Sequence, residues 1–221
     1  MHSDHSPWDV LLIGGASGLG KSRAAAALAA RHGAFTVEFD DVVAALQAAT
    51  TPATHPGLHH FDAQGDDDLH APDDPTGSRT GSPEESPEES PDAQRVLELQ
   101  IATAHALDEA LLGVVRNRLT VDVPAVIEGD YLTPAAAARC AAEAGRRGRR
   151  VRAVFLHEHD PARISANYAD REPDLGPQPE RAEVSARYSA WLADQARAHG
   201  LPVVDCRPYA TLARRLAAAL A

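Results

Sequence analysis

The chain has 221 residues, of which 44% are hydrophobic, and its formal net charge is −11. This length is enough for one α/β domain with a substantial buried core. Eleven acidic residues and one arginine lie between residues 62 and 92, so nearly all of the net charge belongs to that segment. The rest of the chain is nearly neutral and offers no global field for nucleic acid, which we exclude as a partner.

The cysteines and the start of the chain bear on its compartment. Cys140 and Cys206 are far apart and form no Cys-x-x-Cys pair, which fits a reducing cytosol better than a disulfide framework or a zinc site. The first residues show no signal peptide, and no apolar run approaches the roughly 20 residues that span a bilayer. We therefore expect a cytoplasmic protein without a membrane partner.

Apolar runs typical of strands alternate with helical patterns along most of the chain. Thr133 and Asp160 each precede a proline and are expected to cap the helices that follow them. Strands separated by helices imply a three-layer α/β fold, a five-stranded parallel sheet with helices on both faces. We predict strands at 8–13, 35–39, 123–129, 151–157 and 201–206, and helices at 21–32, 41–49, 94–118, from 134, from 161, at 180–199 and at 208–220.

Residues 62–93 interrupt this alternation. The segment repeats Ser-Pro-Glu-Glu and has almost no large apolar side chains. It cannot bury enough surface to offset the entropy of ordering, so we predict a disordered acidic insertion within one domain that spans residues 1–221. Both a passive solvated loop and a partner-binding segment are compatible with this composition.

Residues 10–22, Val-Leu-Leu-Ile-Gly-Gly-Ala-Ser-Gly-Leu-Gly-Lys-Ser, fit two kinds of nucleotide site. Up to Gly20 the stretch is similar to the Gly-rich turn of short-chain dehydrogenases, but through Ser22 it is a Walker A loop. Those dehydrogenases need a Tyr-x-x-x-Lys pair, and none of the four tyrosines is followed by a lysine in this way. Lys21 is the only lysine in the chain, and it stands where the Walker A loop requires one. The sequence therefore predicts a triphosphate site.

Each part of this loop has an expected role. Its glycines let backbone N–H groups turn toward the β- and γ-phosphates, and the helix that begins near Lys21 adds its positive end. Lys21 is predicted to reach the phosphate oxygens, and the Ser22 hydroxyl to coordinate Mg²⁺. The expected cofactors are ATP and Mg²⁺, and the nucleotide is expected to contact Gly15, Ala16, Ser17, Gly18, Leu19, Gly20, Lys21 and Ser22.

Acidic residues follow two other predicted strands. We assign Asp40 as the base or orienting group for an attacking hydroxyl and Asp41 as the cap of the next helix. Glu128 and Asp130 end the third strand, where a Walker B carboxylate would hold a Mg²⁺-bound water. Both are candidate metal ligands, and the sequence leaves open which is nearer the metal.

A short stretch rich in proline and charge, residues 171–181, follows the fourth strand and its helix. Such a segment suits a lid that closes over a nucleotide and brings arginines to the phosphates. Arg171 is the preferred catalytic candidate, Arg163 is a candidate nucleotide ligand, and Arg181 is a further candidate.

The order of these motifs resembles a known family. The Walker A loop, the acid after the second strand, Val-Ile-Glu-Gly-Asp-Tyr-Leu-Thr-Pro, the Arg-flanked lid and Gly-Leu-Pro-Val-Val-Asp are similar to 2-phosphoglycerate kinase-like P-loop kinases and, more loosely, to shikimate kinase and chloramphenicol phosphotransferase. The resemblance implies a five-stranded P-loop kinase core, with Asp40 as the substrate-side acid and Glu128 as the carboxylate of the Glu-Gly motif. This chain has Ala44 where such kinases often have an arginine, and Asp130-Tyr131 where Val-His is usual.

These observations predict an ATP-dependent kinase that acts on the hydroxyl of a small metabolite or natural product. A competing hypothesis is a nucleotide-binding regulatory protein whose acidic insertion recruits a partner. In either case the choice of substrate depends on the geometry of a few side chains.

Overall fold

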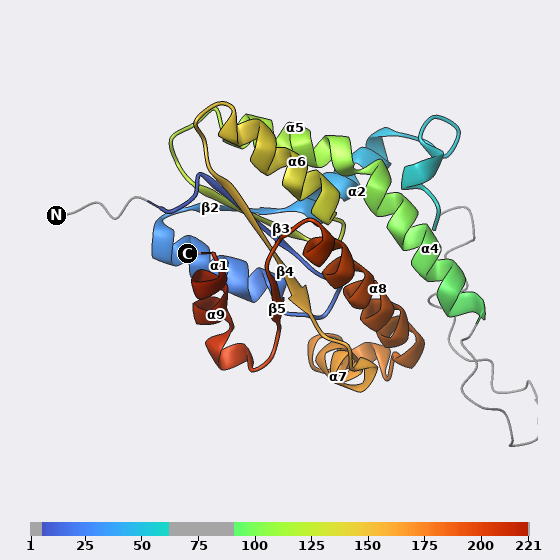
Figure 1. Cartoon of the computed structure of the whole chain (residues 1–221). Helices are drawn as coiled ribbons and strands as arrows, with labels where there is room; N and C mark the ends of the chain where they lie inside the picture. Colours follow the sequence, from blue (N-terminus) through green and yellow to red (C-terminus); the bar gives the residue numbers. More distant parts are fainter. Residues whose placement is uncertain (1–5, 62–90, 221) are drawn as a thin grey trace, which may run out of the picture.

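A computed structural model describes residues 6–61 and 91–220 (Figure 1). Its five strands form one parallel sheet in the order β2-β3-β1-β4-β5. Gly14 of β1 lies opposite both Gly129 of β3 and Phe155 of β4, so the carboxyl ends of the central strands meet at one edge of the sheet. The strands are β1 Val10–Gly14, β2 Phe35–Glu38, β3 Ala125–Gly129, β4 Val151–His157 and β5 Val203–Asp205.

Helices cover both faces of the sheet. Figure 1 shows α1 and α9 on one face and α6 and α8 on the other, with α5 packed on α6 and α4 packed on α8. This arrangement confirms the predicted three-layer fold. The helices are α1 Lys21–His32, α2 Phe39–Ala49, α4 Pro91–Ala106, α5 Asp108–Arg118, α6 Pro134–Gly145, α7 Pro161–Arg171, α8 Pro179–Ala198 and α9 Leu212–Ala219, with short 3-10 turns η1 Pro56–Leu58, η3 Pro173–Leu175 and η4 Tyr209–Thr211.

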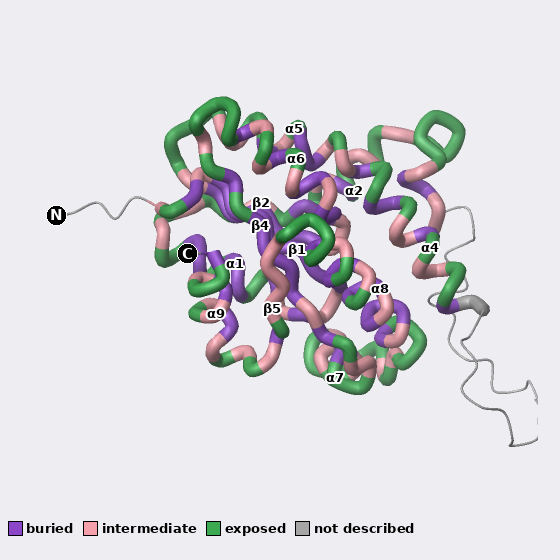
Figure 2. The backbone as a smooth tube through the Cα atoms, viewed as in Figure 1, coloured by how far each residue is buried: buried purple, intermediate pink, exposed green. Residues whose placement is uncertain are grey.

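The central strands form the core. Every residue of β1 and β3 is buried, whereas the edge strand β2 is largely exposed (Figure 2). Continuous burial along a strand is expected where helices cover both faces of a parallel sheet. Within the described residues, no helix combines the length and the apolar character needed to cross a membrane.

Both predicted helix caps are confirmed. The Thr133 hydroxyl accepts the N–H of Ala136 at 3.1 Å, and the Asp160 carboxylate accepts the N–H of Ala162 at 3.0 Å. The predicted cap at Asp41 is wrong, because α2 begins at Phe39 and places Asp41 inside the first helical turn.

The prediction for residues 91–118 needs two corrections. The helix expected at 94–118 is two helices, α4 and α5, which meet at Leu107. The Leu107 side chain is buried, and no glycine or proline marks the break, so the apolar pattern continues across it. Residues 91–93 are helical and are not part of an insertion, since α4 begins at Pro91. The rest of the predicted insertion, 62–90, lies outside the described residues.

Gly14 allows the close approach of β1 to β4. A Cβ atom at Gly14 would lie 2.3 Å from the ring of Phe155, which is fully buried. We expect Gly14→Ala to lower the free energy of unfolding by about 1–3 kcal/mol, because the ring or the strand must move. Denaturant titration measures this change.

Gly113→Ala on α5 is the matched control, since a Cβ atom there would meet no neighbouring atom within 4 Å. Alanine is the better helix former, so this variant should be as stable as the parent or more stable by up to about 1 kcal/mol. Equal destabilisation by the two substitutions would contradict the steric argument at Gly14.

Candidate functional site: the phosphate loop and its neighbours

β1 ends in the Gly-rich loop that leads into α1. Gly18 and Gly20 have φ angles of 78° and 82°, in the left-handed region that favours glycine. Gly20 directly precedes α1, and no side chain caps that end of the helix. The first N–H groups of α1, next to the positive end of the helix dipole, are therefore available to an anion.

Two tyrosines from distant parts of the chain pack against this loop. A Cβ atom on Gly18 would lie 3.0 Å from the ring of Tyr168 in α7, which is fully buried. A Cβ atom on Gly20 would lie 3.1 Å from the ring of Tyr209 in η4. A side chain at either position would therefore be tight against a tyrosine ring and would also need a backbone conformation that favours glycine.

Lys21 is the first residue of α1, and its side chain is only 7% exposed. Its ammonium group donates to the carbonyl of Ala16 at 3.0 Å and forms an ion pair with Asp130. Burial opposes the charged form, but the combined attraction of Asp130, Glu128 and Asp40, with the hydrogen bond to Asp130, outweighs it, so the pKa of Lys21 is raised. The lysine is therefore held as a cation between the loop and the end of β3.

Three carboxylates lie around this ammonium group. Glu128 is buried in β3, Asp130 follows β3, and Asp40 lies in the first turn of α2. The register of the sheet brings them together, because Glu38 at the end of β2 lies opposite Glu128. The Asp40 Oδ1 atom accepts the backbone N–H of Asp130 at 3.4 Å. The acidic residues predicted at the ends of two separate strands thus lie around one lysine.

Gly129 permits this meeting. A Cβ atom on Gly129 would lie 2.9 Å from the Cβ atom of Phe39 and 3.2 Å from the Oδ1 atom of Asp40. A larger residue would push α2 away from the end of β3. The glycine between Glu128 and Asp130 therefore has a steric role.

The surroundings of these acids change their ionisation. Burial, with a contribution from the charge of Asp130, raises the pKa of Asp40 to about 6, although Lys21 acts in the opposite direction. Asp40 as a residue is exposed, but its Oδ1 atom faces inward to the Asp130 N–H. Burial also raises the pKa of Glu128, against the opposing effects of a hydrogen bond with Ser22 and of Lys21. Asp40 therefore changes charge at a pH of about 6.

The candidate metal residues provide few ligands. The Ser22 side chain is a hydrogen-bond partner of Glu128, and Asp130 is paired with Lys21. In residues 6–61 and 91–220, no group of three His, Cys, Asp or Glu side chains could hold a metal ion. This donor set fits Mg²⁺ bound mainly by waters and phosphate oxygens, with one or two protein ligands.

The two arginines that flank the expected lid are engaged with an acid. Arg171 and Arg181 both donate to Glu172, and the Arg181 guanidinium lies 4.3 Å from the centre of the Tyr168 ring. Burial disfavours the charged form of Glu172, but hydrogen bonds that include those from both arginines hold its pKa at about 2. The structure therefore places these two arginines, both about half-exposed, in one ion-pair network around Glu172.

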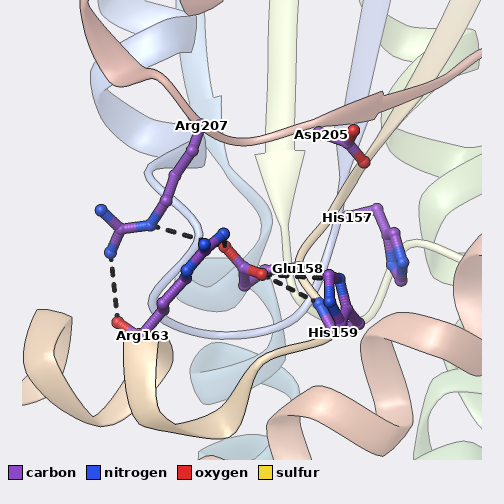
Figure 3. A pocket seen from close by; sticks show the side chains of 6 residues that line it. All are labelled: His157, Glu158, His159, Arg163, Asp205 and Arg207. Carbon is purple, nitrogen blue, oxygen red and sulfur yellow. Dashed lines mark hydrogen bonds and ion pairs between the residues drawn. The ribbon is translucent and has the colours of Figure 1, made fainter.

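Arg163 lines a hollow of about 130 Å³ at the carboxyl ends of β4 and β5 (Figure 3). Arg163 and Arg207 both extend toward the buried carboxylate of Glu158, at 3.8 Å and 3.4 Å. Because β4 and β3 flank β1 on opposite sides, this hollow and Asp40 lie on opposite sides of β1.

Sequence reasoning missed Asn167, Tyr168 and Tyr209 at the loop, and Arg207 behind Asn167. Asn167 of α7 donates to the Gly18 carbonyl at 2.8 Å and to the Tyr209 hydroxyl at 2.7 Å, and it accepts from Arg207 at 3.0 Å. Arg207 and Tyr209 come shortly after β5. Because the carboxyl ends of parallel strands lie at the same edge of the sheet, this position after a predicted strand could have identified both residues. Asn167 carries no such signal, because it is one polar residue within a helix.

The sheet order and the loop after β1 define a P-loop kinase fold. A gluconokinase from Sinorhizobium meliloti 1021 has a similar structure over 98% of this chain and 93% of its own, with a TM-score of 0.51 and 17% sequence identity. A shikimate kinase from Acinetobacter baumannii, solved in complex with shikimate, matches 96% of this chain and 90% of its own, with a TM-score of 0.44 and 11% identity. At 17% identity the likeness to the gluconokinase concerns the fold alone.

The family assignment comes from the sequence profile of the AAA domain, which matches residues 10–193. The match covers most of the chain, so the protein belongs to this family of P-loop domains. A comparison with curated proteins finds no match.

Proposed function

We propose that this protein is an ATP-dependent phosphotransferase that acts on the hydroxyl group of a small molecule. The observation that carries the proposal is that Lys21 and Asp40 belong to the same group of charged side chains. The Lys21 ammonium would bind phosphate, and the nearby Asp40 carboxyl group has a pKa of about 6. Phosphoryl transfer depends mainly on alignment and charge neutralisation. Lys21 would neutralise the charge of the nucleotide phosphates, and Asp40 would align the acceptor hydroxyl.

The remaining residues of the cluster have roles that follow from their contacts. Ser22 and Glu128 would hold Mg²⁺, directly or through water, with Asp130 as a further ligand. The ion, when bound, neutralises phosphate charge. Phosphate oxygens must compete with Asp130 for Lys21, because the two side chains are ion-paired.

We place the far end of the nucleotide at the hollow beside Arg163 and Arg207. The hollow is on the side of β1 opposite Asp40, so a nucleotide there leaves the Asp40 side to the acceptor. Arginine guanidinium planes stack on aromatic rings, and both side chains are at least one-third exposed.

Arg171 remains the proposed catalytic arginine. Its side chain is 51% exposed and paired with Glu172, so it would have to leave this partner to reach a phosphate. We propose that the segment after α7 closes during the reaction, as lids of phosphoryl-transfer enzymes do.

A screen of ATP consumption with small hydroxylated compounds tests the proposal. Sugars, polyols, hydroxy acids, nucleosides and aminoglycoside- or phenicol-like compounds would be tested singly, with mass spectrometry of the products. We expect one class to raise ATP consumption above the acceptor-free rate and to gain one phosphoryl group. ATP binding that is accompanied by no acceptor-stimulated turnover would contradict the kinase and favour a nucleotide-binding regulatory protein.

A further inference from the structure

The carbonyl group of Gly18 is held from outside the phosphate loop. The side-chain amide of Asn167 donates to this oxygen at 2.8 Å, and the Tyr209 hydroxyl lies 3.5 Å from it. The next residue of α7, Tyr168, packs its buried ring against Gly18. Two successive residues of one helix therefore set the position of the peptide group that follows Gly18.

The direction of this carbonyl determines the direction of the neighbouring N–H group. A trans peptide is planar, and its C=O and N–H point in opposite directions. When the Gly18 carbonyl faces Asn167, the Leu19 N–H must point away from α7. Gly18 has a φ angle of 78°, which few other residues adopt. Because the backbone at a glycine can adopt many conformations, a hydrogen bond from outside the loop helps to select one orientation of the peptide group that follows Gly18.

Asn167 is itself held in place. Its Oδ1 atom accepts from Arg207 at 3.0 Å, which requires the amide nitrogen to face Gly18 and Tyr209. Arg207 is anchored in turn by the buried carboxylate of Glu158, 3.4 Å from its Nε atom (Figure 3), and it lies 5.0 Å from the ring centre of Tyr209. The side-chain amide therefore has a single orientation, with its donor on the loop.

We propose that Asn167 is a positioning residue of the phosphate loop, which holds the Gly18 carbonyl outward so that the Leu19 N–H faces the phosphates. This inference rests on the nucleotide-binding function proposed above. Because α7 also carries Arg171 at its end, Asn167 links the loop to the helix that leads into the lid segment.

Asn167→Asp tests the inference with a minimal change in shape. The carboxylate still accepts from Arg207, but it cannot donate to the Gly18 carbonyl and repels it. We expect the dissociation constant for Mg·ADP, measured by calorimetry, to rise at least about tenfold. The KM for ATP should rise with it, while the KM for the acceptor stays unchanged. Asn117→Asp, at an exposed site on α5, is the control. It should change the dissociation constant for Mg·ADP and the KM for ATP by less than about twofold.

Melting temperatures separate positioning from stability. A lower melting temperature of Asn167→Asp with an unchanged dissociation constant for the folded protein would overturn the inference. Should this variant fail to fold, Asn167→Leu removes the donor without adding charge, and an unchanged dissociation constant there overturns it equally. Failure of the unaltered protein to bind Mg·ADP would defeat the proposed function itself, whereas normal binding by both Asn167 variants would defeat only this inference.

Discussion

Lys21→Ala is expected to lower acceptor-dependent phosphoryl transfer by at least about 100-fold. Lys21 is the only lysine of the chain, and its ammonium lies between the loop carbonyl of Ala16 and the carboxylate of Asp130. Removing one preorganised group that stabilises transferring charge costs about 10²–10³ in rate. Initial rates of product formation at saturating ATP, with the melting temperature measured in parallel, test this expectation.

The control variants separate chemistry from stability. Arg23→Ala removes an exposed cation two residues further along α1 and should leave the transfer rate unchanged. Lys21→Ala leaves Asp130 without its ion-pair partner, which destabilises the protein. The double variant Lys21→Ala, Asp130→Asn should recover stability without recovering transfer. A transfer rate in Lys21→Ala equal to that of the parent would refute the assignment of this loop.

Asp40→Asn is expected to lower the transfer rate by about 10²–10⁴, the usual contribution of a general base. Asp40 must be ionised to accept the hydroxyl proton, and its pKa is raised to about 6. The rate of the parent protein should therefore rise with pH through about 6 and level off above it. The variant should lack this pH dependence, which a rate profile between pH 5 and 8 measures.

The raised pKa of Asp40 also predicts the sign of a stability change. A carboxyl group with a raised pKa in the folded state favours folding when protonated, and this contribution is lost as the pH rises through about 6. The uncharged Asp40→Asn should therefore be at least as stable as the parent at pH 8, so its loss of activity would not reflect unfolding. Asp41→Asn, one residue further along α2, should keep both the rate and the pH profile. A substrate-stimulated rate that survives Asp40→Asn would remove Asp40 from the mechanism.

The order of strands and helices could be predicted from the sequence because each element has its own local signal. The buried strands β1 and β3 are continuous apolar runs, and the helices after Thr133 and Asp160 begin with a cap and a proline. The phosphate loop was equally accessible, since its glycines, lysine and serine are consecutive in the chain. Local patterns of this kind need no knowledge of distant contacts.

Other features depend on packing between distant segments. The break at Leu107 has no marker in the sequence, because a buried leucine continues the apolar pattern of both helices. The ion pairs of Arg171 and Arg181 with Glu172 depend on how the segment between α7 and α8 folds back. The positions of these arginines in the sequence do not identify the acidic residue with which each one pairs.

The sequence by itself determined the fold class and the identity of the loop, because both are written in runs of neighbouring residues. Only the tertiary structure decided that Asp40 lies beside Asp130, and that Asn167 supports Gly18. These contacts join residues far apart in the chain, and they form only when parallel strands bring their carboxyl ends to a common edge of the sheet. The same crowding raises the pKa of Asp40, a property that no single stretch of sequence carries.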